Sequence, residues 1–279
     1  MNWHSDWPAP AKLNLFLHVV GRRPDGYHLL QTVFRFIDCA DFLRFTPRDD
    51  GQIVLSTPTP GVAPDDDLTV RAARLLQAHT GCRQGAGIAL TKNLPMGGGL
   101  GGGSSDAATV LLALNHLWQT GMARTELEHL GLQLGADVPV FVHGRNCFAE
   151  GVGERFIDLD LPQTTYLILH PDAHVPTAAI FGAATLRRDT PALAPVLWQP
   201  GVGHNDLEPV ACAAFPPVAA ALEWLRGFAP KALMTGSGAC VFAAFADPDE
   251  AQAVLDQRPS GWRGWLARGL VQHPLAEIG

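Results

Sequence analysis

The sequence predicts an α+β protein, because strand-like and helix-like patterns are mixed along it without internal repeats. Residues 11–21, AKLNLFLHVVG, alternate with the period of two that is typical of a strand. Residues 107–118 carry apolar side chains at the spacing of a helix with one core-facing side. A change to proline-rich connections near residue 155 indicates two parts, residues 1–155 and 156–279.

The elements follow in order along the chain. In the first strand, Leu13, Leu15, Leu17 and Val19 are expected on one face and Lys12, Asn14, Phe16 and His18 on the other. A turn at 23–27 leads to three expected strands, 30–38, 41–45 and 51–56. They are followed by an acid-capped helix over 65–81, with Leu68, Ala72, Leu75 and Leu76 on its inner side, and by a strand over 87–93. The next helix, up to Trp118, is followed by one in which Thr125 and Glu128 can form a capping box and which ends at Gly135. A strand over 165–170 opens the second part.

Composition excludes several classes of protein. Hydrophobic residues make up 47% and charged residues 17%, which predicts a chain folded throughout. A net charge of −7 without a lysine or arginine run argues against nucleic acid or an anionic membrane surface as partner. The five scattered cysteines form no C-x-x-C, and the first residues lack the pattern of an export signal. We therefore expect a cytoplasmic protein, and the sequence makes no prediction of its oligomeric state.

Six glycines stand among the seven residues 97–103, between an expected strand and a helix. A G-x-G-x-x-G match is present, but Pro95 interrupts the approach and a second helix follows the first, so a Rossmann unit is not predicted. Walker A also fails, because no Gly-Lys-Ser/Thr ends the loop. Bare backbone N–H groups at a helix N-terminus beside Ser104 and Ser105 describe a cradle for phosphate. The alternative is a mobile hinge.

Two residues could carry chemistry beside a bound phosphate. Asp137 follows a helix end and precedes an apolar run, so its carboxylate fits the rim of a cleft, although a helix N-cap is an equal alternative. Lys12 shares a strand face with Asn14 and can point into a polar site, although it can also be a solvated surface lysine. Gly236 and Gly238 predict a tight turn or a second backbone wall.

Three segments together resemble the three motifs of the GHMP kinase superfamily: PAPAKLN at 8–14, PMGGGLGGGSSDAA at 95–108 and TGSGACVF at 235–242. PDGYH, GADVPVF and PTAAIF narrow the resemblance to members that phosphorylate a cytidine-diphosphate derivative of methylerythritol in the non-mevalonate isoprenoid pathway. The resemblance implies a two-lobed fold with the active site in the cleft between lobes. It also implies transfer of the γ-phosphate of ATP to the 2-hydroxyl of that small-molecule substrate.

The roles of individual residues follow from the same resemblance. Asp137 would take or orient the hydroxyl proton, and Lys12 would hold that carboxylate ionised. Tyr27 and Phe181 would sandwich the cytosine while His28 reads its polar edge. Asn14 would contact the same substrate, and Thr177 would line the cleft. Mg²⁺ would arrive with ATP, with protein ligands unassigned. The loop that would wrap the ATP phosphates consists of Pro95, Met96, Gly97, Gly98, Gly99, Leu100, Gly101, Gly102, Gly103, Ser104 and Ser105.

Two other functions are alternatives to this prediction. Another small-molecule kinase of the superfamily, acting on mevalonate or homoserine, would need no aromatic clamp. A nucleotide-binding regulator that has lost catalysis would have no need of Lys12, Asp137 and a complete glycine loop together.

Overall fold

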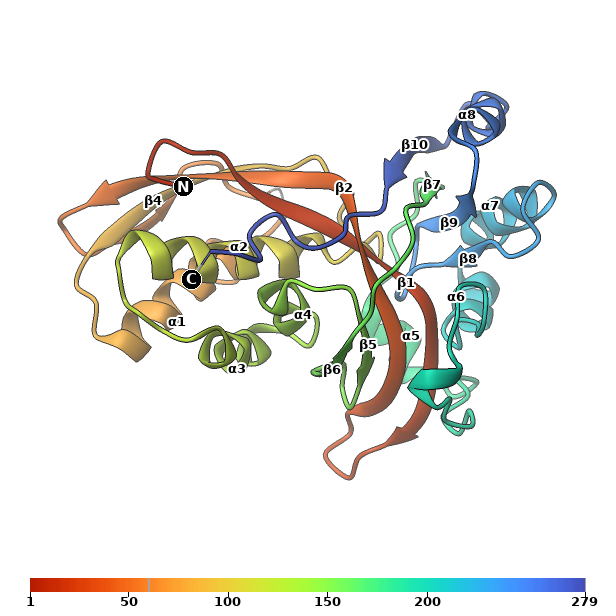
Figure 1. Ribbon diagram of the computed structural model, residues 1–279, viewed down its shortest axis with the longest axis horizontal. Coiled ribbons are helices and arrows are strands. Elements are labelled where there is room, and N and C mark those ends of the chain that lie inside the picture. Colours follow the sequence, from red (N-terminus) through yellow and green to blue (C-terminus); the bar gives the residue numbers. More distant parts are fainter. Residues whose placement is uncertain (60, 279) are drawn as a thin grey trace.

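The structure is a computed structural model that describes residues 1–59 and 61–278. It contains two sheets, each formed by strands that follow one another along the chain: β1 to β6 in the first and β7 to β10 in the second (Figure 1). The first has the order β3-β4-β2-β5-β6, with β1 paired to β2, and only β3 and β4 are parallel. The second is antiparallel, with the order β10-β7-β9-β8. The strands are β1 (Trp7–Arg22), β2 (His28–Arg48), β3 (Ile53–Leu55), β4 (Gly85–Thr91), β5 (Cys147–Glu150), β6 (Arg155–Asp158), β7 (Thr165–His170), β8 (Leu233–Met234), β9 (Val241–Phe245) and β10 (Arg263–Arg268).

Helices accompany each sheet and separate the molecule into two cores. In Figure 1 the first four helices lie below β1, β2 and β4, α6 and α7 stand beside β8 and β9, and α8 stands beside β10. Apolar side chains of the first group pack with Trp7, Phe36 and Phe45 in one core, and those of the second pack with Leu167 and Val241 in another. The helices are α1 (Leu68–Thr80), α2 (Gly102–Leu117), α3 (Arg124–Leu134), α4 (Val138–His143), α5 (Thr177–Gly182), α6 (Glu208–Ala214), α7 (Pro216–Arg226) and α8 (Pro248–Asp256), with a 3₁₀ turn at Pro195–Leu197.

The long β1–β2 ribbon connects the two cores. Both strands belong to the first sheet, but Leu17 and Val19, near the hairpin end of β1, pack in the second core. The backbone N–H of Leu17 donates to the carbonyl of His204 at 2.8 Å, and that of Asp206 donates to Leu17 at 2.8 Å. Residues on the middle of β1 therefore lie where the two cores meet, which is where a site shared by both can form.

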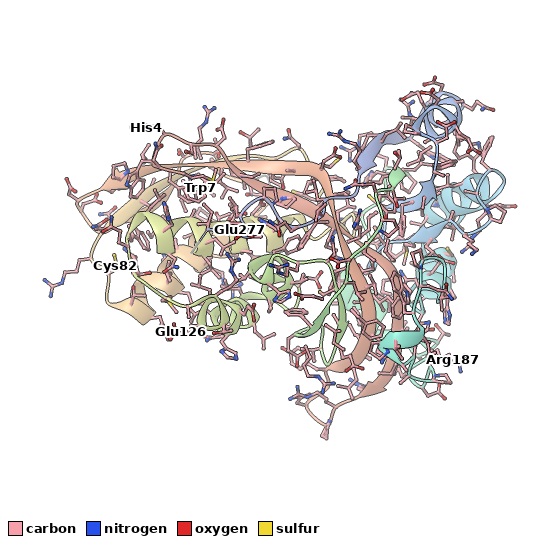
Figure 2. The ribbon with its side chains drawn as sticks, viewed as in Figure 1. His4, Trp7, Cys82, Glu126, Arg187 and Glu277 are labelled. Atoms are coloured by element: carbon pink, nitrogen blue, oxygen red, sulfur yellow. The ribbon has the colours of Figure 1, made fainter. Side chains whose placement is uncertain are left out.

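The C-terminal segment after β10 returns to the first core. Leu270 donates its backbone N–H to the carbonyl of Phe36 at 2.8 Å, and Leu275 is completely buried among residues of the first core. The Arg124 guanidinium on α3 donates to the carbonyls of Leu275 and Ala276 at 3.2 and 2.8 Å. Figure 2 shows Glu277 beside α2, far from β10. The first core is thus completed by residues 270–278.

Most local predictions agree with the structure, and four differ from it. The strands expected over 30–38 and 41–45 are one strand, β2, because the intervening Cys39 and Ala40 stay extended and Ala40 pairs with Pro10 of β1. A register shift between Asn14 and Leu17 breaks the expected alternation of β1. α3 begins two residues earlier than expected, with the Glu126 carboxylate accepting the Ala123 N–H at 2.7 Å in place of a Thr125 cap. In α1, Leu68 and Leu75 are only partly buried, and the inner side is formed by Val70, Ala72, Ala73 and Leu76.

The five cysteines are free thiols, and only Cys147 and Cys240 are fully buried. Burial raises the pKa of Cys39 to about 11, so its thiol stays protonated and unreactive at neutral pH. Within residues 1–59 and 61–278, none of the helices has both the length and the apolar character needed to cross a membrane.

Candidate active site

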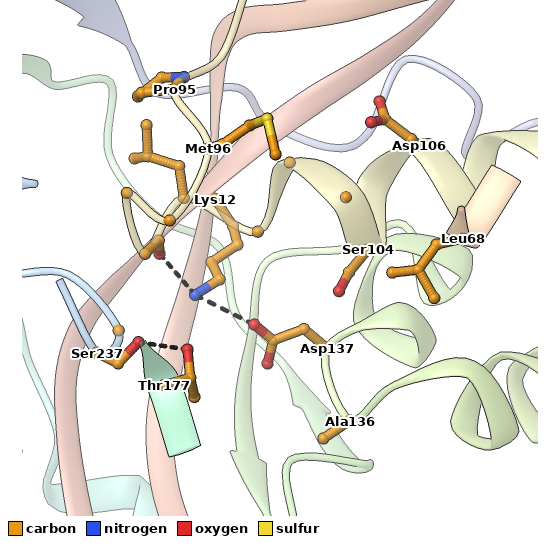
Figure 3. Close-up of a pocket in the computed structure, with 18 of the residues that line it drawn as sticks. Lys12, Leu68, Pro95, Met96, Ser104, Asp106, Ala136, Asp137, Thr177 and Ser237 are labelled. Carbon is orange, nitrogen blue, oxygen red and sulfur yellow. Dashed lines mark hydrogen bonds and ion pairs between the residues drawn. The ribbon is translucent and has the colours of Figure 1, made fainter. Parts of the chain in front are cut away.

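A cavity of about 580 Å³ lies where the two cores meet. One wall consists of Lys12, Asn14 and neighbouring residues of β1 and β2, and the glycine loop with the start of α2 forms another. Asp137 before α4 and the turn at 236–238 close the remaining sides (Figure 3). The predicted site residues that line it are Lys12, Asn14, Asp137, Thr177, Phe181 and all of 95–104.

Lys12 is a buried cation with a complete set of partners. Its side chain is 3% exposed, and its ammonium donates to Asn14 Oδ1 at 2.5 Å and to the Gly99 carbonyl at 3.0 Å. The third partner is Asp137 Oδ2, 3.4 Å away. An ammonium has three N–H donors, so this geometry fixes its position. The alternative of a solvated surface lysine is therefore excluded.

Asn14 orients this cation from the same strand. Its Oδ1 accepts from Lys12, its Nδ2 donates to Thr32 Oγ1 at 2.9 Å, and its backbone N–H donates to Thr235 Oγ1 at 3.0 Å. The register shift that follows Asn14 brings Leu17 into the cavity wall as well, although alternation predicts Leu17 on the opposite face from Lys12.

Asp137 occupies the N-cap position of α4 but makes no side-chain cap hydrogen bond. Its carboxylate points to Lys12 instead, and its side chain is 39% exposed toward the cavity (Figure 3). Pro139 in the first turn of the helix has no N–H to be capped, which leaves the carboxylate available. The carboxylate is therefore ion-paired and accessible, as a group that receives or orients a proton must be.

The glycine loop is held by backbone hydrogen bonds on two sides. The carbonyls of Gly97 and Gly98 accept from the N–H groups of Ala239 and Cys240, each at 3.1 Å, and the Leu100 carbonyl accepts from Lys12 at 3.0 Å. Gly99 has a φ of +73° and approaches the 235–240 turn so closely that a Cβ would lie 2.1 Å from the Thr235 carbonyl oxygen. The loop is thus a fixed wall, which contradicts the alternative of a mobile hinge.

α2 begins directly after this loop and directs its N-terminus into the cavity. Gly101 is the N-cap, without a side-chain cap, so the first backbone N–H groups of the helix remain available to a ligand. These groups and the helix dipole favour an anion such as phosphate at this point. Gly102, Gly103 and Ser104 line the cavity beside them.

Ser105 differs from its neighbour Ser104. It is completely buried outside the cavity lining, and its hydroxyl donates to the Pro10 carbonyl at 2.7 Å. Its backbone N–H donates to the Gly101 carbonyl at 2.8 Å. Both polar groups are used within the fold, so the structure gives Ser105 a role in attaching α2 to β1.

A charged cluster in the cavity wall is not apparent from the sequence. Lys92 at the end of β4 is paired with Asp41 and with Asp106, whose Oδ2 is 2.8 Å from its ammonium. Asp106 Oδ1 is buried without a hydrogen-bond partner among the described residues. Burial raises the pKa of Asp106 to about 7 despite the nearby ammonium. The three residues are far apart in sequence; the position of Asp106 directly after the two serines is the only local signal.

The residues expected to bind a base have two different positions. Thr177 and Phe181 line the cavity, and the Thr177 and Ser237 hydroxyls are 2.8 Å apart (Figure 3). Tyr27 and His28 lie outside the cavity lining, on the hairpin between β1 and β2. Tyr27 is 61% exposed, whereas the His28 ring packs on Phe181 with 5.1 Å between centroids. The hairpin and α5 therefore form the rim of the same cavity.

No group of three acidic, histidine or cysteine side chains able to hold a metal occurs in the part of the chain that the structure describes. Mg²⁺ commonly binds through substrate phosphates and waters with only one or two protein oxygens. The Ser104 hydroxyl and the Asp137 carboxylate, both in the cavity wall, fit that mode.

Comparison with known proteins gives consistent matches over the whole chain. Residues 67–145 match the GHMP kinases N terminal domain, and residues 192–264 match the GHMP kinases C terminal domain. The 4-diphosphocytidyl-2-C-methyl-D-erythritol kinase of Dechloromonas aromatica (strain RCB) is 71% identical over 272 residues, covering 98% of this chain and 99% of the relative. The protein of that name from Ralstonia nicotianae is 59% identical over 277 residues, covering 97% and 96%.

Solved structures agree with these matches. A crystal structure of 4-(cytidine 5'-diphospho)-2C-methyl-D-erythritol kinase superposes with a TM-score of 0.82 at 36% identity, covering 95% of this chain and 99% of the other. A crystal structure of mevalonate kinase superposes with a TM-score of 0.72 at 14% identity, covering 96% and 99%, which is a similarity of fold.

Proposed function

This chain belongs to the GHMP kinases, and we propose that it transfers the γ-phosphate of ATP to the 2-hydroxyl of 4-diphosphocytidyl-2-C-methyl-D-erythritol. The products would be the 2-phosphate and ADP, within the non-mevalonate route to isoprenoid precursors. The observation that carries the proposal is the accessible Lys12–Asp137 ion pair beside the glycine loop and the α2 N-terminus. The two cores would act as lobes on either side of the cleft. The expected division into residues 1–155 and 156–279 is corrected in two places, because residues 156–158 and 270–278 belong with the first core.

The reaction follows from this arrangement. The substrate oxygen attacks the γ-phosphorus, the bond to the bridging oxygen of ADP breaks, and the hydroxyl proton passes to Asp137. Lys12 pairs with that carboxylate at 3.4 Å and lies close enough to contact the same hydroxyl. The loop amides stabilise the charge on the transferred group. Phosphoryl transfer needs mainly positioning and charge stabilisation, so these groups suffice.

The cytidine end of the substrate would lie at the rim formed by the β1–β2 hairpin and α5. Tyr27 and Phe181 would stack on the base from opposite sides, and His28 would bind its polar edge. Thr177 lines the path between the base and the reaction centre, and Asn14 holds Lys12. A partly exposed pair of aromatic rings suits a planar base better than mevalonate or homoserine.

Mg²⁺ would enter with ATP and offset negative charge on the phosphates. The Ser104 hydroxyl and the Asp137 carboxylate, both in the cavity wall, are the groups that would hold it. We place the enzyme in the cytoplasm, acting on a small molecule without nucleic acid or membrane as partner.

A coupled assay for ADP release tests the proposal. The enzyme should release ADP with ATP and the cytidine-diphosphate substrate together, and at least about a hundredfold more slowly with mevalonate, homoserine or no acceptor. Faster turnover of mevalonate or homoserine would indicate another kinase of the family. ATP binding without turnover of any acceptor would indicate a regulator.

A further inference from the structure

Arg188 connects the β1–β2 hairpin to the segment that follows α5. Its Nε donates to His28 Nε2 at 3.0 Å, across 160 residues of sequence. Its two terminal nitrogens donate to three backbone carbonyls at 2.8–3.0 Å, those of Phe181, Ala183 and Leu186. The guanidinium thus holds the aromatic residue of α5 and the histidine of the hairpin in one fixed arrangement.

This contact determines which His28 nitrogen carries the proton. A guanidinium has only donors and stays charged, so His28 Nε2 must accept through its lone pair. A neutral imidazole that accepts at Nε2 carries its hydrogen on Nδ1. Burial lowers the pKa of His28, and the positive charges of Arg188 and Arg22 lower it further, which keeps the ring neutral.

The Nδ1–H group is the remaining polar group of a ring that lies at the rim of the cavity. The His28 and Phe181 rings are 5.1 Å apart and inclined by 37°, and Phe181 lines the cavity. A base stacked on Phe181 would present its edge toward His28. Cytosine has an acceptor at N3, which matches an N–H donor, whereas uracil has its own N–H there and is repelled. Such a mismatch leaves buried donors unpaired and lowers affinity.

We propose that Arg188 is a positioning residue that fixes His28 as the Nδ1–H tautomer and thereby makes the site select cytosine over uracil. The proposal rests on the proposed function for the nature of the base. Arg188 acts through His28: four of its five N–H donors are directed to His28 and to the three carbonyls.

The tautomer can be measured without any substrate. Nitrogen-15 NMR of the full-length protein labelled at histidine, with His28 assigned through a His28→Gln variant, should show a protonated Nδ1 and an unprotonated Nε2. The Arg188→Ala variant should show averaging between the two tautomers. A protonated Nε2 in the wild-type protein would overturn the role of Arg188.

Kinetics test the consequence for recognition. Arg188→Ala should raise the KM for the cytidine substrate about tenfold and reduce the preference over the uridine analogue by a similar factor. Its kcat and its KM for ATP should stay within about twofold, because the phosphate-binding loop is untouched. The matched control is Arg187→Ala: this neighbour is exposed, pairs with Asp189 and points outward in Figure 2, so its kinetics should equal those of the wild type.

A double-mutant cycle separates tautomer control from simple anchoring of the loop. If Arg188 acts through His28, Arg188→Ala should have no further effect on base preference in a His28→Ala background. An equal loss in both backgrounds would mean that Arg188 only holds the carbonyls, and would overturn the proposal. A wild-type enzyme that does not turn over the cytidine substrate would instead refute the proposed function and, with it, the selection of cytosine.

Discussion

Lys12 and Asp137 form an ion pair whose two members have very different exposure. The lysine side chain is 3% exposed and keeps two further acceptors, whereas the aspartate is 39% exposed and has its second oxygen free for a substrate. Removing the aspartate charge should therefore leave the lysine held in place, with a stability change within about 1 kcal/mol. Such a pair can be tested for catalysis without disturbing the fold.

Asp137→Asn should lower kcat by about 10²- to 10⁴-fold, because the amide cannot take a proton. A loose transition state needs little help from a base, which favours the lower end of that range. ATP affinity and melting temperature should remain near those of the wild type, since the phosphates lie on the loop and Asp137 makes no cap hydrogen bond. Asp160→Asn, at an exposed position, is the matched control. A kcat within about threefold of wild type would exclude Asp137 as the catalytic carboxylate.

Ser104 and Ser105 provide a second comparison, between adjacent residues of one helix. Ser104→Ala should weaken ATP binding about tenfold without loss of stability, because alanine is a good helix former and Ser104 lines the cavity. Ser105→Ala should leave ATP affinity unchanged and cost roughly 1–3 kcal/mol, because it removes the partner of the Pro10 carbonyl. Calorimetric titration with ATP and urea unfolding of both variants check this. The reverse pattern would mean that Ser105 is the phosphate ligand.

At the scale of single elements, the glycine loop and α2 show what a sequence can predict. The loop, the helix after it and the strand that carries Lys12 are each determined by residues close together in sequence. The local pattern is therefore sufficient to predict that these elements form. The cluster of Lys92, Asp41 and Asp106 was missed because its members come from the segment just after β4, from β2 and from α2, which only the folded chain brings together. The same applies to Arg188 and His28, which are 160 residues apart.

Two glycines of this element should respond oppositely to alanine. Gly99→Ala should destabilise the protein by about 2 kcal/mol or more, because the residue has a φ of +73° and its Cβ would lie 2.1 Å from the Thr235 carbonyl oxygen. Gly103→Ala meets only Leu68 Cδ1 at 3.7 Å, so it should be neutral or stabilise the helix by up to about 1 kcal/mol. Its methyl group should nevertheless weaken ATP binding severalfold, because it intrudes on the cavity wall. Melting temperatures and ATP titrations decide this; an unchanged ATP affinity for Gly103→Ala would place the phosphates elsewhere.

For the whole molecule, the important feature is the return of the C-terminal segment to the first core. No periodicity or motif in residues 269–278 predicts it, because the segment has no regular element of its own and its partners are Phe36, Arg124 and Asn146. Folding of the first core therefore depends on residues 270–278, which are distant from it in sequence. His273 is the titratable group at the centre of this contact: it is 1% exposed, and its ring meets that of Phe36 edge-on at 5.4 Å.

Stability should consequently fall as the pH drops below neutrality. Burial, assisted by the charge of Arg124, lowers the pKa of His273 to about 3, whereas an unfolded histidine titrates near 6.5. Between these values the unfolded chain binds the proton and the folded chain does not, so this residue stabilises the fold above pH 6.5 and loses that contribution as pH decreases toward 3. From pH 7 to pH 5 the loss should be about 1–2 kcal/mol.

His273→Asn should remove this dependence. The asparagine side-chain oxygen can still accept the Leu275 N–H that His273 Nδ1 now accepts at 3.0 Å, but it cannot be protonated. The variant should be less stable than wild type at pH 7, because packing on Phe36 is lost, and the difference should shrink by about 1–2 kcal/mol at pH 5. Urea unfolding at both pH values measures this. His4→Asn, at an exposed histidine near the N-terminus (Figure 2), should retain the wild-type dependence. Equal pH dependence in His273→Asn and wild type would show that the C-terminal contact does not respond to pH through His273.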